Sequence, residues 1–199
     1  MIVDLLGEGS PENPVFLKLY DRRFAEQLRG DHGIDPWTMD AEKEYINAVR
    51  TGAGKLVPRL VARVHLARSL PDAGIGNTDA AEAKLLHIKG ILLQYIDCFS
   101  LSKMQDHAPK SEWQGIVDQA VAIVQAIGDH GILNRDVRPD NFIVWRDRSG
   151  CYRVFMIYFG LARLRGRNES DRDWAKAKLT KDEEGAVGGD EEAAWQRRL

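Results

Sequence analysis

The sequence predicts an α+β fold in which a strand-rich first half is followed by a helix-rich second half. Two observations carry this prediction. Short apolar runs typical of strands recur through residues 1–95. A longer run, residues 111–131, then spaces its apolar residues as one face of a helix. We therefore expect a small, mainly antiparallel sheet with one helix, joined near residues 95 to 100 to a mainly helical part.

Composition limits the class of protein. A chain of 199 residues with 44% hydrophobic residues suits one soluble domain, or one domain with two lobes. The formal net charge of −2 gives no electrostatic reason to expect nucleic acid or a membrane as partner. Cys98 and Cys151 are too few for a disulfide framework or a zinc site, which favours a reduced, cytoplasmic setting. The start does not read as a signal peptide, and no stretch approaches about 20 apolar residues.

The first half is expected to place strands around one helix. Residues 2–6 (IVDLL) and 15–20 (VFLKLY) flank the turn GEGSPEN, and this pattern predicts a β-hairpin. Residues 36–52 predict a helix, because Thr38 can cap its start, acids crowd its first turn and Gly52 follows its end. Two more strands are expected at VPRLVARVHLA and, of the fully buried kind, at HIKGILLQYI.

The second half is expected to be built on one amphipathic helix, which runs from Ser111 to near Gly128. Its predicted buried stripe consists of Trp113, Ile116, Val117, Ala120, Val121, Val124 and Ile127. The runs NFIVW and CYRVFMI, joined by RDRSG, predict a second hairpin. DRDWAKAKLTKDEEG predicts a last helix, and the charged, Gly-containing stretch 179–199 is expected to be loosely ordered.

Three short motifs follow one another in an order that matches a known signature. VFLK ends in Lys18, NRDVRPDN spans residues 134–141, and YFG spans residues 158–160. Protein kinases carry a strand Lys, a catalytic loop H-R-D-x-x-x-x-N and a D-F-G motif in this order. Over residues 2–165 the chain resembles the protein-kinase-like superfamily, in particular small fungal kinase-like proteins.

The resemblance implies a two-lobed, protein-kinase-like fold with a reduced N-lobe sheet and a truncated helical C-lobe. All 199 residues would form one domain. Its parts would be an N-lobe (1–95), a hinge (96–101), a C-lobe core (102–165) and a charged C-terminal segment (166–199).

The resemblance also implies roles for residues in an ATP-binding cleft. Asp136 would be the catalytic base, and Lys18 would contact phosphates while paired with Glu42, or with Glu44 as the other choice. Arg138 would replace a phosphate-contacting Lys, or else be a surface arginine. The remaining implied contacts are Leu93 beside the adenine, backbone groups of Gln94 and Ile96 at the hinge, and Asn141 as a ligand of Mg²⁺.

Several departures weaken the expected chemistry. The loop His is Asn134, the Asp of D-F-G is Tyr158, and no G-x-G-x-x-G precedes Lys18. A phenol has an ordinary pKa of about 10 and stays uncharged near neutrality, whereas Mg²⁺ prefers carboxylate oxygens. Losing a metal ligand worth several kcal/mol predicts a rate lower by orders of magnitude. Phe16 also replaces a small residue, and we expect its ring to fill the adenine slot unless it packs sideways.

Two classes of function remain open on the sequence. The first is a pseudokinase, a binding or regulatory module whose partner is a protein or a small molecule in the cleft between the lobes. The second is an ATP-dependent phosphotransferase, or a repurposed enzyme, that uses Lys18, Asp136 and Asn141. Simpler interpretations exist, in which Lys18 is a solvated lysine, Asp136 and Asn141 are turn residues, and Tyr158 is a packed aromatic. Asp140 and Asp147 are expected to be solvated loop acids.

Overall fold

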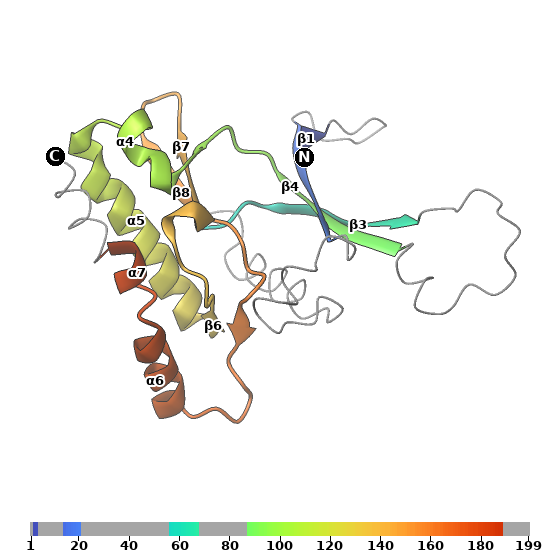
Figure 1. The fold of residues 1–199 in the computed structure, drawn as a ribbon, viewed down its shortest axis with the longest axis vertical. Helices are drawn as coiled ribbons and strands as arrows, with labels where there is room; N and C mark the ends of the chain where they lie inside the picture. Colours follow the sequence, from blue (N-terminus) through green and yellow to red (C-terminus); the bar gives the residue numbers. More distant parts are fainter. Residues whose placement is uncertain (1, 4–13, 21–55, 68–86, 189–199) are drawn as a thin grey trace, which may run out of the picture. The chain divides into compact units, whose positions relative to one another are not determined.

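The structure of the protein is a computed structural model that describes residues 2–3, 14–20, 56–67 and 87–188. Contacts divide the chain into two units (Figure 1). One comprises Met1–Met39 and Arg59–Tyr95, and the other comprises Asp40–Pro58 and Ile96–Leu199. The predicted helix at 36–52, with Glu42 and Glu44, and the turn GEGSPEN before Pro14 lie outside the described residues.

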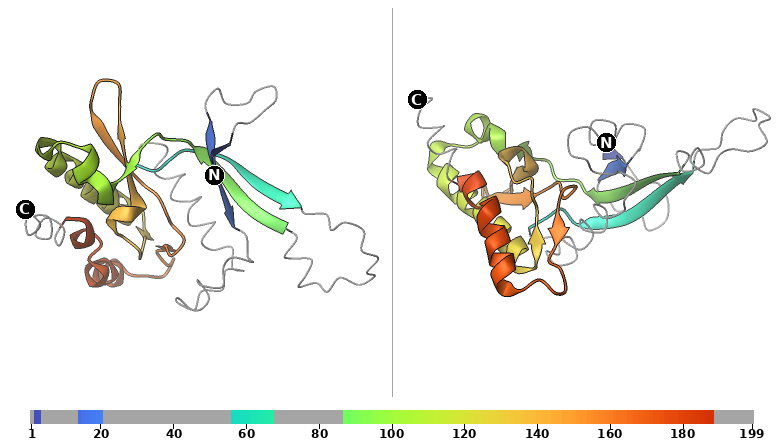
Figure 2. Two further views of the ribbon diagram at one scale, coloured as in Figure 1. Left: turned by 45° about the horizontal axis from the view of Figure 1, so that its top comes forward. Right: turned by 60° about the horizontal axis from the view of Figure 1, so that its bottom comes forward.

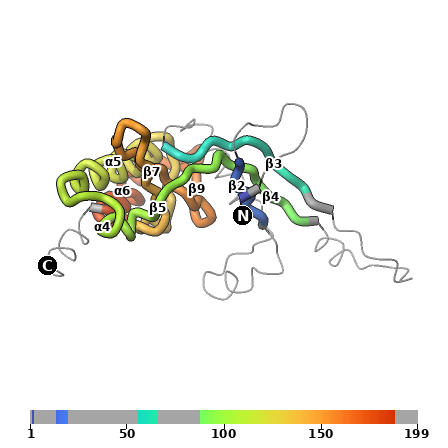
Figure 3. Tube along the Cα trace, turned by 90° about the horizontal axis from the view of Figure 1, so that it is seen from above, coloured from blue at the N-terminus to red at the C-terminus, as the bar shows by residue number. Residues whose placement is uncertain are grey.

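The first unit contains a four-stranded antiparallel sheet with the strand order β1-β2-β4-β3. Its strands are β1 (Ile2–Val3), β2 (Val15–Tyr20), β3 (Leu60–Ala67) and β4 (His87–Gln94). The long strands β3 and β4 run side by side (Figure 3). Ile91, Leu92 and Leu93 are consecutive and all buried, so β4 is covered on both faces, as its sequence predicts.

Gly90 allows the central strand to approach its neighbours. It lies opposite Leu19 of β2 and Val64 of β3. A Cβ atom at this position would lie 2.8 Å from the carbonyl oxygen of Lys18 and 2.9 Å from a methyl carbon of Val64. Because one of these neighbours is backbone, any side chain here would push the strands apart.

The second unit is organised around α5 (Lys110–Asp129), which confirms the predicted long helix. The helix lies against β8 and α7. Its buried residues are Ile116, Ala120, Ile123, Val124, Ile127 and Gly128. Val117 and Val121 of the predicted stripe are half-buried, whereas Ile123 was not predicted and is buried, because the buried face is rotated slightly from the predicted one.

The predicted second hairpin is confirmed as β7 (Phe142–Arg146) and β8 (Tyr152–Met156), with β5 (Phe99–Ser100) on the other edge of β7. Asp147, expected to be a solvated loop acid, lies in the turn of this hairpin, and its hydrogen bonds are exposed. Its carboxylate accepts hydrogen bonds from the backbone N–H groups of Ser149 and Cys151, both at 2.9 Å. The side chain therefore fixes the hairpin turn, in which Gly150 has a φ of 91°.

Short elements complete the second unit. They are η2 (Leu101–Lys103), α4 (Met104–His107), β6 (Ile132–Leu133), η3 (Pro139–Asn141), β9 (Arg163–Leu164), α6 (Asp171–Lys181) and α7 (Gly185–Gly188). Figure 2 shows α7 beside α5. Within the described residues no helix is long and apolar enough to cross a membrane.

The expectation of a loosely ordered stretch from residue 179 onward is wrong for its described part. Residues 179–181 end α6, and residues 185–188 form α7. Composition suggested disorder, but a few well-placed side chains anchor the stretch. Trp174 is buried and donates its indole N–H to the carbonyl oxygen of Gly128 at 3.3 Å, and Val187 is also buried.

Candidate functional site

The candidate site lies in the second unit, where the loop 134–141 follows β6 and the segment 158–162 precedes β9. β6 and β9 pair as antiparallel strands, with Leu133 opposite Arg163. This pairing brings the two predicted motifs together, and the Asn134 side chain donates a hydrogen bond to the carbonyl oxygen of Tyr158 at 2.9 Å. The two motifs therefore lie side by side, as the sequence predicts.

Asn134 replaces the expected loop His, and it connects the two segments. It is only 2% exposed. Its Nδ2 donates to the Tyr158 carbonyl, and its Oδ1 accepts the backbone N–H of Asp136 at 3.0 Å. Both ends of the buried amide are thus paired, which is the condition for burying a polar side chain without a large cost. This role was not predicted.

Two residues of the candidate site, one in each motif, have an unusual backbone conformation. Arg135 has a φ of 68° and Tyr158 a φ of 76°, both in the left-handed region. This conformation costs a residue other than glycine about 1–3 kcal/mol, so the surrounding contacts must hold it in place. At Arg135 this contact is Glu183, whose carboxylate accepts the backbone N–H groups of Asn134, at 3.2 Å, and of Arg135.

Glu183 is the residue of the site that sequence reasoning missed. It is 9% exposed and comes from the turn between α6 and α7. Burial raises the pKa of its carboxyl group, while the two backbone N–H groups and Lys181 and Lys178 act in the opposite direction. No local signal in the run KDEEG marks this acid, because its partners lie 48 and 49 residues earlier in the chain.

The predicted residues Asp136, Arg138 and Asn141 lie together. The Asn141 Nδ2 donates to the backbone oxygen of Asp136 at 2.6 Å and to its carboxylate at 3.0 Å. Arg138 Nε is 3.6 Å from the other carboxylate oxygen, and the Arg138 side chain is 59% exposed. Asp136 is therefore a half-buried, oriented carboxylate that can accept a hydrogen bond from a ligand. Asp140, expected to be solvated, is exposed and accepts a hydrogen bond from Ser102 at 2.6 Å.

The side chains of this site do not provide the oxygen ligands that usually hold Mg²⁺. Mg²⁺ is normally held by one or two carboxylates in near-octahedral geometry. Asn141 is 4% exposed and its amide nitrogen bonds to Asp136, while Tyr158, 37% exposed, stands where the second carboxylate is expected. Among the described residues no three or more His, Cys, Asp or Glu side chains are grouped so as to hold a metal ion.

The other predicted site residues lie in the first unit, apart from Ile96, which begins the second. Lys18 of β2 pairs with Ile91, and burial lowers the pKa of its ammonium group to about 8. Phe16 is 38% exposed and lies opposite the buried Leu93, on the same sheet face as Lys18. The backbone N–H of Gln94 donates to the Arg59 carbonyl oxygen at 2.8 Å, so this donor is used within the first unit.

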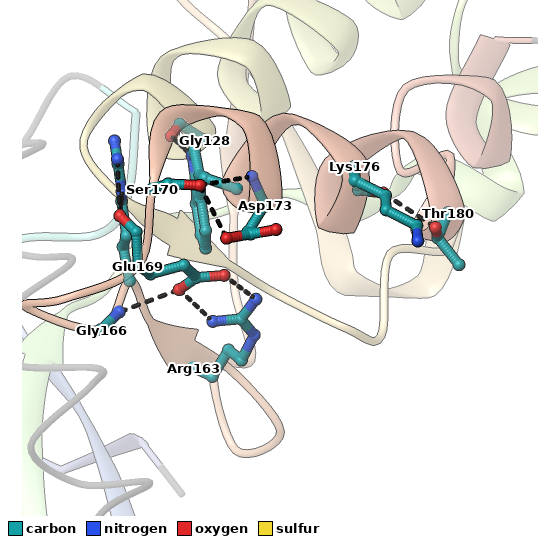
Figure 4. A network of polar contacts seen from close by, with 10 residues as sticks. Gly128, Arg163, Gly166, Glu169, Ser170, Asp173, Lys176 and Thr180 are labelled. Carbon is teal, nitrogen blue, oxygen red and sulfur yellow. Dashed lines mark hydrogen bonds and ion pairs between the residues drawn. The ribbon is translucent and has the colours of Figure 1, made fainter.

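A polar network fixes the segment between the site and α6 (Figure 4). Arg163 makes two hydrogen bonds of 2.9 Å to the Glu169 carboxylate, which also accepts the backbone N–H of Gly166. These contacts lower the pKa of Glu169 to about 2. Ser170 caps α6 by accepting the Asp173 backbone N–H at 3.2 Å. The network anchors β9, and through it the chain that leads back to Tyr158.

No family model matches the chain. A curated protein of Dictyostelium discoideum, described as "Probable serine/threonine-protein kinase pkgA", is 30% identical over 77 residues. The match covers 37% of this chain and 5% of that protein. Part of the chain is therefore similar in sequence to a protein kinase.

A solved structure, "WaaP in complex with acyl carrier protein", is similar over 90% of this chain and 64% of its own. Its sequence identity is 15% and the TM-score is 0.46.

Proposed function

We propose that this chain is a kinase-like protein with impaired phosphoryl transfer, a pseudokinase that acts by binding. The observation that carries the proposal is Tyr158. Its φ of 76° and the Asn134 hydrogen bond to its carbonyl oxygen tie it to the loop of Asp136 and Asn141, yet its side chain is a phenol and not a carboxylate. The similarity of part of the chain to a protein kinase supports the comparison with a metal-dependent site.

The energetic argument follows from the chemistry of phosphoryl transfer. Such reactions depend on positioning and on metal ions that neutralise the phosphate oxygens. A metal ion supplies several kcal/mol of stabilisation, and each 1.36 kcal/mol corresponds to about tenfold in rate. With one oriented carboxylate at the loop, we expect Mg²⁺ and ATP to bind weakly and turnover to be slow. The site would then act by binding a protein or a small molecule rather than by catalysis.

A second function, an ATP-dependent phosphotransferase or a repurposed enzyme, is favoured by one feature of the site. Asp136 is held in a defined orientation by Asn141 and retains 23% side-chain exposure, as a working general base would. The sequence also assigns Lys18 to this function, and burial lowers the pKa of its ammonium group to about 8. Lys18 and Asp136 belong to different units.

Restoring the carboxylate tests the proposal. We expect Tyr158→Asp to bind Mg²⁺ in the presence of nucleotide more tightly than the wild type, with a smaller gain in turnover. Calorimetric titration of Mg²⁺ at fixed ATP measures this affinity. Tyr158→Phe is the matched control, because it removes the hydroxyl without adding a charge, and it should leave Mg²⁺ affinity unchanged. Equal and negligible affinities for wild type and Tyr158→Asp would contradict the proposal.

A further inference from the structure

A surface hollow of about 350 Å³ lies in the second unit, between α5, β6 and the α6–α7 segment. Its apolar wall consists of Val124, Leu133, Ala175 and Leu179. Val124 and Leu133 are buried, at 5% and 3% exposure, whereas Leu179 is 81% exposed. Leu179 and Ala175, which is also exposed, together form an apolar edge of the hollow that a partner can cover. The exposed wall also leaves the hollow open to solvent, which suits a side chain presented by another protein better than an enclosed small molecule.

The rest of the lining is charged and mostly acidic. Asp182, Glu183 and Glu184 line the hollow together with Lys178. Lys178 is already paired with Asp129, at 3.4 Å, and Glu184 accepts a hydrogen bond from Gln125 at 2.8 Å. Lys181 is a further cation close enough to act on Glu183. Three carboxylates and one ammonium group thus line the hollow, and this surface attracts positive charge.

Glu183 connects this hollow to the candidate site. Its side chain lines the hollow, and its two carboxylate oxygens accept the backbone N–H groups of Asn134 and Arg135. A ligand that shifts the α6–α7 turn must therefore also change the hydrogen bonds that hold Arg135 in its left-handed conformation.

We propose that this hollow is a docking site for a protein segment that presents a large apolar side chain between Lys or Arg residues, and that docking is transmitted through Glu183 to the loop 134–136. The apolar side chain would cover Leu179 and enter the hollow. The flanking cations would face Asp182 and Glu184. This inference is independent of whether phosphoryl transfer is impaired.

The test uses the ¹⁵N-labelled full chain and two peptides, acetyl-KRWLRK-amide and its acidic counterpart acetyl-EDWLDE-amide. We expect the basic peptide to cause saturable amide shifts at Ala175, Leu179, Asn134 and Arg135, and the acidic peptide to cause none. Leu179→Glu should weaken the basic peptide by about tenfold or more, because a buried carboxylate replaces an apolar contact. Its matched control is Thr180→Glu, which adds the same charge at a neighbouring exposed position outside the lining.

Each outcome decides one part of the proposal. Simple charge attraction predicts that both glutamate variants bind the basic peptide at least as well as the wild type, and this result would overturn the docking site. Equal binding of the two peptides, or no saturable shift at all, would also overturn it. Shifts at Ala175 and Leu179 that leave the amides of Asn134 and Arg135 unmoved would refute transmission through Glu183.

Discussion

Removing the Glu183 carboxylate should release the loop that carries Asp136. In Glu183→Ala the backbone N–H groups of Asn134 and Arg135 lose their acceptor. A buried donor left unpaired costs about 1–3 kcal/mol, and water can replace part of the loss at the more exposed Arg135. We therefore expect the loop to be destabilised by about 2–4 kcal/mol, which is about 30- to 700-fold in the local opening equilibrium.

Amide hydrogen exchange at Asn134 and Arg135 measures this opening directly. The matched control is Glu184→Ala, which removes the adjacent carboxylate, whose hydrogen bond is to Gln125. Its effect on the two loop amides should be less than about twofold, because the hydrogen bond that is removed is exposed and ends on Gln125 rather than on the loop. Unchanged exchange at both amides in Glu183→Ala would refute the anchoring role.

The raised pKa of Glu183 adds a pH signature with a defined sign. Because burial raises the pKa of the folded carboxyl group above its unfolded value, ionisation costs stability. This contribution is fully present below the unfolded value and is lost as the pH rises through the folded pKa. The free energy of unfolding of the wild type, minus that of Glu183→Gln, should therefore be more positive at about pH 4 than at about pH 8. The opposite order would contradict burial as the cause.

Three further predictions concern other parts of the chain. Gly90→Ala should destabilise the first unit by about 1–3 kcal/mol in urea unfolding. The control Gly115→Ala has no atom within 4 Å of its added Cβ and should stabilise α5 slightly, because Ala favours helix more than Gly does. Equal effects of the two substitutions would argue against the close approach of the strands at Gly90. The pKa of Glu169 is about 2, below its unfolded value, so its ionised form stabilises the fold above that pH and stability should fall as the pH drops from about 4.5 to 2. This fall should be smaller in Glu169→Gln, and an unchanged acid profile would contradict the Arg163 contact as its cause. Phe16→Ala should tighten ATP binding in calorimetry if the ring occupies the adenine slot, and low-micromolar binding by the wild type without tightening in the variant would show that the slot is open.

Periodicity predicted the elements whose partners are close in sequence. The β7–β8 hairpin and α5 follow from runs of about ten to twenty residues, because strand and helix spacing can be read locally. The buried face of α5 was predicted less well, since Ile123 becomes buried only through its tertiary neighbours. Strand β4 was predicted as buried because three apolar residues in a row leave no polar face.

The candidate site could be predicted only in part for the same physical reason. Asp136 and Asn141 lie five residues apart in one motif, and the structure joins them by a hydrogen bond. The roles of Asn134 and Glu183 depend on partners 24 to 49 residues away, and no local pattern marks such pairs. Asn134 was interpreted as a lost His, but its amide supplies the donor and the acceptor that join the two motifs.

The most direct test of impaired phosphoryl transfer is a phosphate-release assay with ATP and either Mg²⁺ or Mn²⁺, comparing the wild type with Asp136→Asn. Asparagine keeps the size of the side chain and removes its charge, so Asp136→Asn serves as the inactive reference for a base-dependent reaction. We predict phosphate release that is barely above background and equal in the two proteins. Turnover by the wild type that is lost in Asp136→Asn would contradict the pseudokinase proposal and establish an enzyme.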